Sequence, residues 1–121
     1  MYRLEPKAEK LIEKLSAERV FSTAKALISL PYGILRVEDY SERGTALCHA
    51  LIWSSKIYKS IEEVGKVLNS LGKTLQVLTL TIVIPRDRKS LQRLVKRVGF
   101  IKTEEADEKN EIWLFPIREG A

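Results

Sequence analysis

The sequence predicts an α/β domain whose mixed central sheet is built around a parallel strand–helix–strand unit. Residues 45–53 and 75–84 are two nearly apolar segments of strand length, and the second is rich in β-branched residues. The segment between them carries apolar residues at helical spacing: Ile61, Val64, Val67, Leu68 and Leu71. Two buried parallel strands joined by a crossover helix form a right-handed βαβ unit.

One domain spanning residues 1–121 is expected, because a chain that is 45% hydrophobic has enough apolar residues for one core. No apolar run reaches the length of a membrane span, and the segment MYRLEPKAEK is charged from its third residue, so the expected location is the cytoplasm. Cys48 is the sole cysteine and His49 the sole histidine, which excludes a disulfide and leaves no metal site to expect.

The elements before this unit are predicted to be two helices and a strand. Residues 6–20 have one apolar stripe formed by Ala8, Leu11, Ile12 and Leu15. A second short helix is expected near residues 22–30, where Pro31 would stop it. A strand and a polar turn at 41–44 then lead into residues 45–53, which are expected to be covered on both faces.

The remaining elements follow from their boundary residues. Ser60 and Glu63 predict a capping box at the start of the central helix, and Gly72 predicts its end. A second helix is expected from Arg88 to Val98, followed by an antiparallel pair at 100–102 and 111–117 that is joined by the acidic turn EEADEKN. Helices are thus expected on both faces of the sheet, with Trp53 and Trp113 packed in the core.

The carboxyl ends of the two parallel strands predict an anion site. The segment SSKIYKS (residues 54–60) leaves the first strand, and PRDRKS (85–90) leaves the second at the same edge of the sheet. Their hydroxyl and cationic side chains favour a phosphate beside the helix N-terminus. Tyr58 would be a hydroxyl donor or an amphipathic lid residue. The alternative is that these cations are solvated surface, since Glu62 and Glu63 in the first helical turn would repel a pyrophosphate.

The net charge of +5 leaves nucleic acid open as a partner. The residues that would contact it are Arg86, Arg88, Lys89, Arg93, Lys96 and Arg97. Against this, a strand precedes the basic helix where a helix-turn-helix would need a helix, and aromatic residues for base stacking are few. Composition also leaves a homodimer open.

The segment LTLTIVIPRDRKSLQRLVKRVGFIKTEEADEKNEIWLFPI resembles the C-terminal half of GNAT-superfamily N-acyltransferases, and it is especially similar to shortened phage and viral members. The matching pieces are Ile84-Pro85, Ser90, Gly99-Phe100 and the terminal strand, and the resemblance covers roughly residues 33–117. The phosphate loop departs from the family pattern, because SSKIYKS contains no glycine. Arg88 and Val95 stand where the family often has asparagine and tyrosine.

The resemblance implies acetyl-CoA as co-substrate and a primary amine, of a small molecule or a protein, as acceptor. It implies cofactor binding by Ser55, Lys56, Ile57, Tyr58, Lys59, Ser60 and Arg88. The fourth strand of the family corresponds to residues 45–53, which carry no carboxylate. A carboxylate of the preceding strand, Glu38 or Asp39, would have to serve, and the candidate catalytic bases are His49 and Glu38. The alternative is a binding protein without catalysis, whose basic edge engages nucleic acid or an acidic partner.

Overall fold

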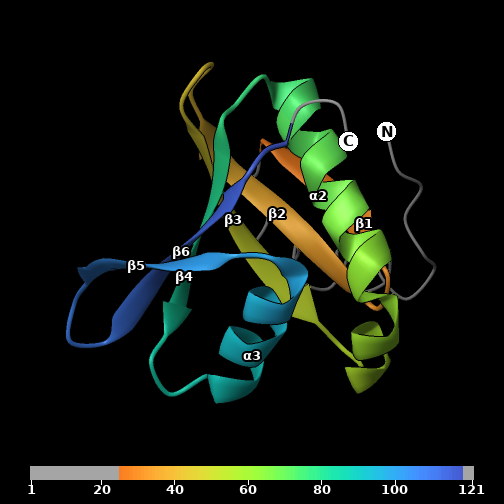
Figure 1. Cartoon of the computed structure of the whole chain (residues 1–121), viewed down its shortest axis with the longest axis vertical. Helices are drawn as coiled ribbons and strands as arrows, with labels where there is room; N and C mark the ends of the chain where they lie inside the picture. The colour runs from red at the N-terminus through yellow and green to blue at the C-terminus, as the bar shows by residue number, and fades with distance from the viewer. Residues whose placement is uncertain (1–24, 119–121) are drawn as a thin grey trace, which may run out of the picture.

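The structure, a computed structural model, describes residues 25–118 and contains one six-stranded mixed sheet with two α-helices (Figure 1). The elements in chain order are β1 (Ala26–Leu30), β2 (Gly33–Tyr40), β3 (Thr45–Ile52), the 3₁₀ helix η1 (Ser55–Ser60), α2 (Ile61–Leu75), β4 (Thr79–Pro85), α3 (Lys89–Val98), β5 (Ile101–Ala106) and β6 (Asn110–Pro116). The strand order in the sheet is β1-β2-β3-β4-β6-β5.

The predicted βαβ unit is confirmed. β3 and β4 are neighbours and run parallel, with Thr45 opposite Thr79, and α2 connects them. All other pairs in the sheet are antiparallel, including the predicted closing hairpin of β5 and β6. The sheet is therefore mixed, with its one parallel pair in the middle.

The prediction of a helix near residues 22–30 is wrong for Ala26–Leu30, which form strand β1. Leu30 pairs with Gly33, so Pro31 and Tyr32 form a two-residue hairpin turn. Proline favours the first central position of such a turn, and Tyr32 takes the positive φ of 56° that the second position requires. Pro31 thus begins a β-turn instead of ending a helix. The helix expected within residues 6–20 lies outside the described residues.

Both ends of α2 also differ from expectation. Ser60 makes no side-chain capping bond, because η1 runs directly into α2 and leaves no extended residue to act as N-cap. The helix continues past Gly72 to Leu75, and Gln76 caps it in the left-handed conformation. Gly72 is required for packing instead, since a Cβ there would overlap with Cδ1 of Ile117.

The main core lies between the sheet and the two helices, which cover the same face (Figure 1). Cys48, Leu80 and Ile82 come from the central strands, and they pack with buried residues of α2 and α3 such as Leu68 and Leu94. On the opposite face of β3, Thr45 and His49 are exposed within the described structure, so the expectation that this strand is covered on both faces is wrong at these positions. α2 and α3 are the α-helices of residues 25–118, so a helix on this second face is not among the described residues.

Gly99, which ends α3, has a φ of +125° that side chains rarely adopt. Replacing Gly99 with alanine is expected to lower the free energy of unfolding by about 1–3 kcal/mol. Gly65 is the matched control, because it lies inside α2 and a Cβ there would meet only the carbonyl oxygen of Val98, at 3.7 Å. Gly65→Ala should raise stability by roughly 0.5–1 kcal/mol. Urea unfolding measures both changes, and equal effects at the two glycines would contradict the backbone argument.

Candidate functional site at the ends of β3 and β4

The parallel pair β3–β4 comes apart before its carboxyl end. Its register runs from Thr45↔Thr79 to Cys48↔Ile82. Past that point, β3 continues to pair with β2, and β4 continues to pair with β6. The facing edges of the two strands therefore carry main-chain groups without a strand partner in this part of the described chain. Such groups need hydrogen bonds from another source when they are buried.

A cleft of about 290 Å³ lies at the carboxyl end of β3, beyond the last β3–β4 pair. Three segments line it: the end of β3 with the residues that follow it, η1, and the start of α3. The lining residues are Ala50, Ile52, Trp53, Ser54, Ser55, Ile57, Tyr58, Arg88, Ser90, Leu91 and Leu94. Apolar walls with a few hydroxyls and one guanidinium are typical of sites for small molecules that have a charged end.

The segment after β3 is a 3₁₀ helix and not the loop expected from the sequence. Ser54 is its N-cap, with a hydroxyl oxygen that accepts a hydrogen bond from the Lys56 amide at 3.2 Å. Ile57 anchors the segment, because its side chain is 1% exposed and lies in the core. Lys56 and Lys59 are exposed on the outside of η1. Burying Ile57 thus fixes which side of the segment faces the cleft.

Tyr58 joins the two sides of the cleft. Its hydroxyl donates a hydrogen bond to the carbonyl oxygen of Ser90 at 3.0 Å, which links η1 to the first turn of α3. The Arg97 guanidinium lies 5.5 Å from the centre of the Tyr58 ring, in the geometry of a cation–π contact. This hydrogen bond goes to the backbone of the protein itself, so both interpretations of Tyr58, a donor to a ligand and a lid residue, stay predictions.

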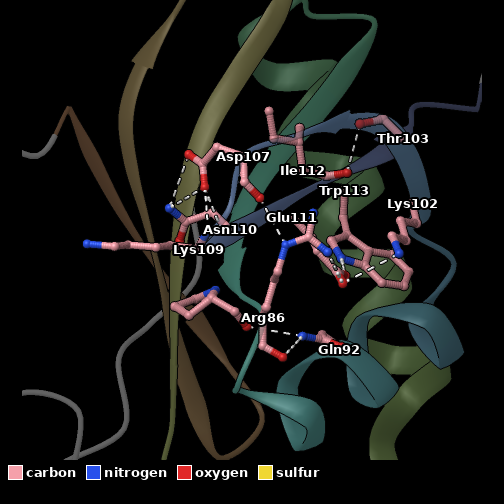
Figure 2. Close-up of polar contacts among 11 residues, drawn as sticks. Arg86, Gln92, Lys102, Thr103, Asp107, Lys109, Asn110, Glu111, Ile112 and Trp113 are labelled. Carbon is pink, nitrogen blue, oxygen red and sulfur yellow. Dashed lines mark hydrogen bonds and ion pairs between the residues drawn. The ribbon is translucent and has the colours of Figure 1, made fainter.

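Polar contacts hold the segment that leaves β4 (Figure 2). The side-chain Nε2 of Gln92 donates to the carbonyl oxygens of Pro85 and Arg86, at 3.1 and 3.0 Å. The backbone N–H of Arg86 donates to the carbonyl oxygen of Lys109, and its side-chain Nε donates to the carbonyl oxygen of Asp107, both in the β5–β6 turn. Since Arg88 follows two residues later, these bonds fix the backbone that carries the guanidinium of the cleft.

Glu111 is a buried carboxylate beside this segment, with a side chain that is 7% exposed (Figure 2). Its Oε1 lies 3.4 Å from Lys102 Nζ and 3.8 Å from Arg86 Nη1. Its Oε2 accepts a hydrogen bond from the indole nitrogen of Trp113 at 3.3 Å. Trp113 is buried in the core as expected. Trp53 is half-buried and lines the cleft, so core packing was the wrong expectation for Trp53.

Replacing Glu111 with alanine is expected to lower the free energy of unfolding by about 2 kcal/mol, because the buried indole N–H loses its acceptor and the two cations lose a partner. Glu111→Gln keeps an acceptor for Trp113 but no charge, so it should cost about half as much. Urea unfolding at neutral pH measures both variants. A Glu111→Ala protein as stable as the parent would show that the carboxylate does not stabilise the fold.

The structure brings together four of the seven residues expected to bind the cofactor: Ser55, Ile57, Tyr58 and Arg88 line the cleft. Lys56, Lys59 and Ser60 belong to η1 but do not line it. Sequence reasoning missed Ser90, Leu91 and Leu94 as lining residues. Their position in the first turns of the helix after β4 was the available indication, since that helix starts at the same sheet edge.

The candidate bases Glu38 and His49 lie together. His49 Nε2 is 3.2 Å from Glu38 Oε2, and Arg36 also forms an ion pair with Glu38. His49 precedes Ala50 in β3, so its side chain points to the sheet face opposite the cleft-lining side chain. The pair is thus adjacent to the parting strands but on the face opposite the two helices.

The described residues also bear on a thiol nucleophile, a metal site and a membrane-spanning helix. Burial and the nearby Glu38 raise the pKa of the Cys48 thiol to about 12, so it stays protonated at neutral pH and is not a thiolate nucleophile. Residues 25–118 contain no group of three histidine, cysteine or acidic side chains placed to hold a metal ion. In the same range, no helix is long and apolar enough to cross a bilayer.

The six cations considered for nucleic acid do not form one free surface. Arg86 is engaged with Glu111 and the β5–β6 turn, and Arg97 lies over Tyr58. Lys89, Arg93 and Lys96 are exposed on α3, while Arg88 lines the cleft. The turn that faces Arg86 is itself acidic, and two backbone amides, of Lys109 and Asn110, hold the pKa of Asp107 below its usual range.

Comparisons with known proteins support the fold. No protein-family profile and no curated protein sequence match the chain. Among solved structures, the chain is similar to the N-acetyltransferase PseH of Campylobacter jejuni, with a TM-score of 0.63 at 10% identity, covering 94% of this chain and 92% of that one.

Two further acetyltransferase structures are similar. One is the microcin C7 self-immunity acetyltransferase MccE in complex with acetyl-CoA and AMP, with a TM-score of 0.58, 14% identity, and coverage of 92% of this chain and 71% of that one. The other is a mutant of spermidine N-acetyltransferase SpeG from Vibrio cholerae, with a TM-score of 0.57, 13% identity, and coverage of 96% and 80%. The chain has the GNAT acetyltransferase fold.

Proposed function

We propose that this protein is an N-acyltransferase that moves an acetyl group from acetyl-CoA to a primary amine. The observation that carries the proposal is the parting of β3 and β4 after Cys48 and Ile82, together with the cleft at the carboxyl end of β3. Main-chain groups on the parted edges would pair with the amide-bearing arm of the cofactor, and this pairing requires no particular side chains. The MccE structure, which shares the fold, holds acetyl-CoA.

The residues of the cleft fit such a ligand. Arg88 lines the cleft and is exposed, so a phosphate bound to it would remain partly hydrated. Lys56 and Lys59 on η1 would add attraction without direct contact. The apolar side chains of Ala50, Ile52 and Leu94 would exclude water from the inner part. Acetyl-CoA supplies the activated thioester, so the protein needs no nucleophile of its own.

The work left to the protein is to position the amine and remove its proton. We propose that His49 takes this proton, directly or through a water molecule, and that Glu38 orients its imidazole. As the C–N bond forms, the C–S bond of the thioester would break, and the departing thiolate would take a proton from the imidazolium or from solvent. The amine would then approach from the face of the sheet opposite α2 and α3. His49→Ala should lower kcat while leaving acetyl-CoA affinity unchanged, and equal losses in both quantities would place His49 in cofactor binding instead.

Binding of acetyl-CoA is the direct test. At a ligand concentration of a hundred times Kd, the native protein should gain about 2.7 kcal/mol, which corresponds to a rise in Tm on the order of 10 °C. Arg88→Glu should weaken binding at least tenfold. The Lys56→Glu and Lys59→Glu double variant should weaken it several-fold, with the loss shrinking at high salt. Lys96→Glu is the matched control, because this exposed residue of α3 does not line the cleft.

The outcomes separate the two functions considered. A Tm that acetyl-CoA leaves unchanged would contradict the acyltransferase proposal. If the same preparation retains DNA with a steep salt dependence, and if Lys96→Glu and Arg93→Glu abolish that retention, the protein is a nucleic-acid-binding member of the fold.

A further inference from the structure

A β-turn carries the chain from β4 into α3 and brings Arg88 to the cleft at the carboxyl end of β3, which we call the strand-end cleft. The backbone N–H of Arg88 donates to the carbonyl oxygen of Pro85 at 3.0 Å, which closes the turn over residues 85–88. Arg88 is then the N-cap residue of α3, and its side chain makes no capping hydrogen bond. Among the residues that the structure describes, no hydrogen bond, ion pair or ring contact involves the Arg88 side chain. The backbone of the turn therefore sets where this guanidinium lies.

Gln92 ties the first turns of α3 back to the end of β4 (Figure 2). Its side-chain Nε2 donates to the carbonyl oxygens of Pro85 and Arg86, at 3.1 and 3.0 Å. Its backbone N–H donates to the carbonyl oxygen of Arg88 at 3.2 Å, in the normal pattern of a helix. One residue thus holds both ends of the turn, and within the described part of the chain it is the only residue of α3 whose side chain bonds to the backbone of the turn.

The other arginine of this turn, Arg86, is held from a different side. Its Nε donates to the carbonyl oxygen of Asp107, and its Nη1 lies 3.8 Å from the Glu111 carboxylate. The β5–β6 hairpin therefore fixes Arg86 whether or not α3 is tied to the turn. Arg88 has no such contact in the described structure, so its position depends on the link that Gln92 makes.

The link requires a primary amide at position 92. The side-chain nitrogen of glutamine carries two N–H groups, one for each of the two carbonyl oxygens. A glutamate would present an acceptor to two acceptors, and an apolar side chain would offer no donor. The buried residues of α3 are Leu94 and Val95, so packing in the core does not account for the amide of Gln92.

We propose that Gln92 is a positioning residue, which holds the 85–88 turn so that Arg88 presents its guanidinium to the phosphate groups of an acyl-CoA. This role rests on the proposed function, in which Arg88 binds a phosphate. Gln92 does not line the strand-end cleft, so it acts through Arg88 and not by contact with the ligand. Because the turn is already ordered in the free protein, binding does not have to order it, and a preorganised site binds more tightly.

Isothermal titration calorimetry with acetyl-CoA measures the effect of replacing Gln92 with leucine, which has a similar size but no N–H donor. Gln92→Leu should weaken binding about fivefold, as expected when hydrogen bonds that order a site are lost. Binding of S-acetylpantetheine should change less than about twofold, because this ligand has no phosphate for Arg88 to bind.

Asn69→Leu is the matched control. The Asn69 side chain is also an amide that makes two hydrogen bonds to the backbone, with Arg118 at 3.0 and 2.7 Å, and it does not line the strand-end cleft. Asn69→Leu should leave the Kd for acetyl-CoA unchanged, because it removes the same kind of contact without affecting the 85–88 turn.

A double-mutant cycle with Arg88→Ala distinguishes positioning from a general loss of structure. Since Gln92 acts through Arg88, adding Gln92→Leu to Arg88→Ala should cause no further loss of acetyl-CoA affinity. An equal loss in both backgrounds would overturn the proposal, and so would an equal loss for acetyl-CoA and S-acetylpantetheine.

Circular dichroism and urea unfolding show whether each variant is folded. If Gln92→Leu does not fold, Gln92→Met, which is unbranched and as long as glutamine, decides the question by the same criteria. A parent protein that does not bind acetyl-CoA would contradict the proposed function itself. A parent that binds acetyl-CoA no more tightly than Gln92→Leu would overturn only the role of Gln92, so the two failures are distinguishable.

Discussion

Replacing Ala50 with phenylalanine is expected to abolish the stabilisation of this protein by acetyl-CoA. Ala50 is the first residue of β3 beyond Cys48 whose side chain points to the helix-covered face, and it lines the strand-end cleft. A phenyl ring there would fill the inner part of a cleft whose volume is about 290 Å³. The expected loss is more than a hundredfold in affinity, so the gain of about 2.7 kcal/mol at a hundred times the parent Kd would disappear.

The extra volume also costs about 1–3 kcal/mol of stability through overpacking, so the variant must first be shown to be folded by circular dichroism and urea unfolding. Leu51→Phe is the matched control, because Leu51 is the next residue of β3 and points to the opposite face. It should keep the Tm rise with acetyl-CoA. A folded Ala50→Phe protein that retains the full Tm rise would place the cofactor elsewhere.

Replacing Ile82 with alanine is expected to lower the free energy of unfolding by about 3–4 kcal/mol. Ile82 is 2% exposed, and it forms the last pair of the β3–β4 register with Cys48. It packs in the core with Leu68 of α2 and Leu94 of α3, so the cavity left by its side chain would lie among three elements that cannot all move inward.

Val83→Ala is the control for Ile82→Ala, because Val83 is the adjacent residue of β4, is half-buried and points to the other face. Its expected cost is about 1 kcal/mol. Urea unfolding gives both values from the midpoint and slope. If the two variants lose the same stability, the main core does not lie on the helix-covered face.

Sequence reasoning found the elements in which one pattern dominates. The apolar run around β4 and the helical spacing of Leu91, Leu94, Val95 and Val98 define their elements without help from distant residues. β1 was missed because a run of five residues before a proline is too short for its pattern to distinguish a strand from a short helix. Its pairing with β2 through a two-residue turn makes it a strand, and this pairing depends on residues outside the run.

The position of the site was predictable, but its composition was only partly so. A βαβ unit places ligand-binding segments at the carboxyl ends of its strands, which is where the cleft lies. The hydrogen bond from Tyr58 to Ser90 depends on η1, whose 3₁₀ geometry has no clear pattern in SSKIYKS. Glu111 was within reach of sequence reasoning, since it alternates with Trp113 and Phe115 and so falls on an apolar face.

The early parting of β3 and β4 also bears on how far such a chain can diverge. Hydrogen-bonding groups supplied by the peptide backbone survive almost any substitution that preserves the two strands. Selection on a site of this kind acts chiefly on the fold and only weakly on residue identity. Under the proposed function, this explains how the chain can match acetyltransferase structures at 10–14% identity although no family profile matches its sequence.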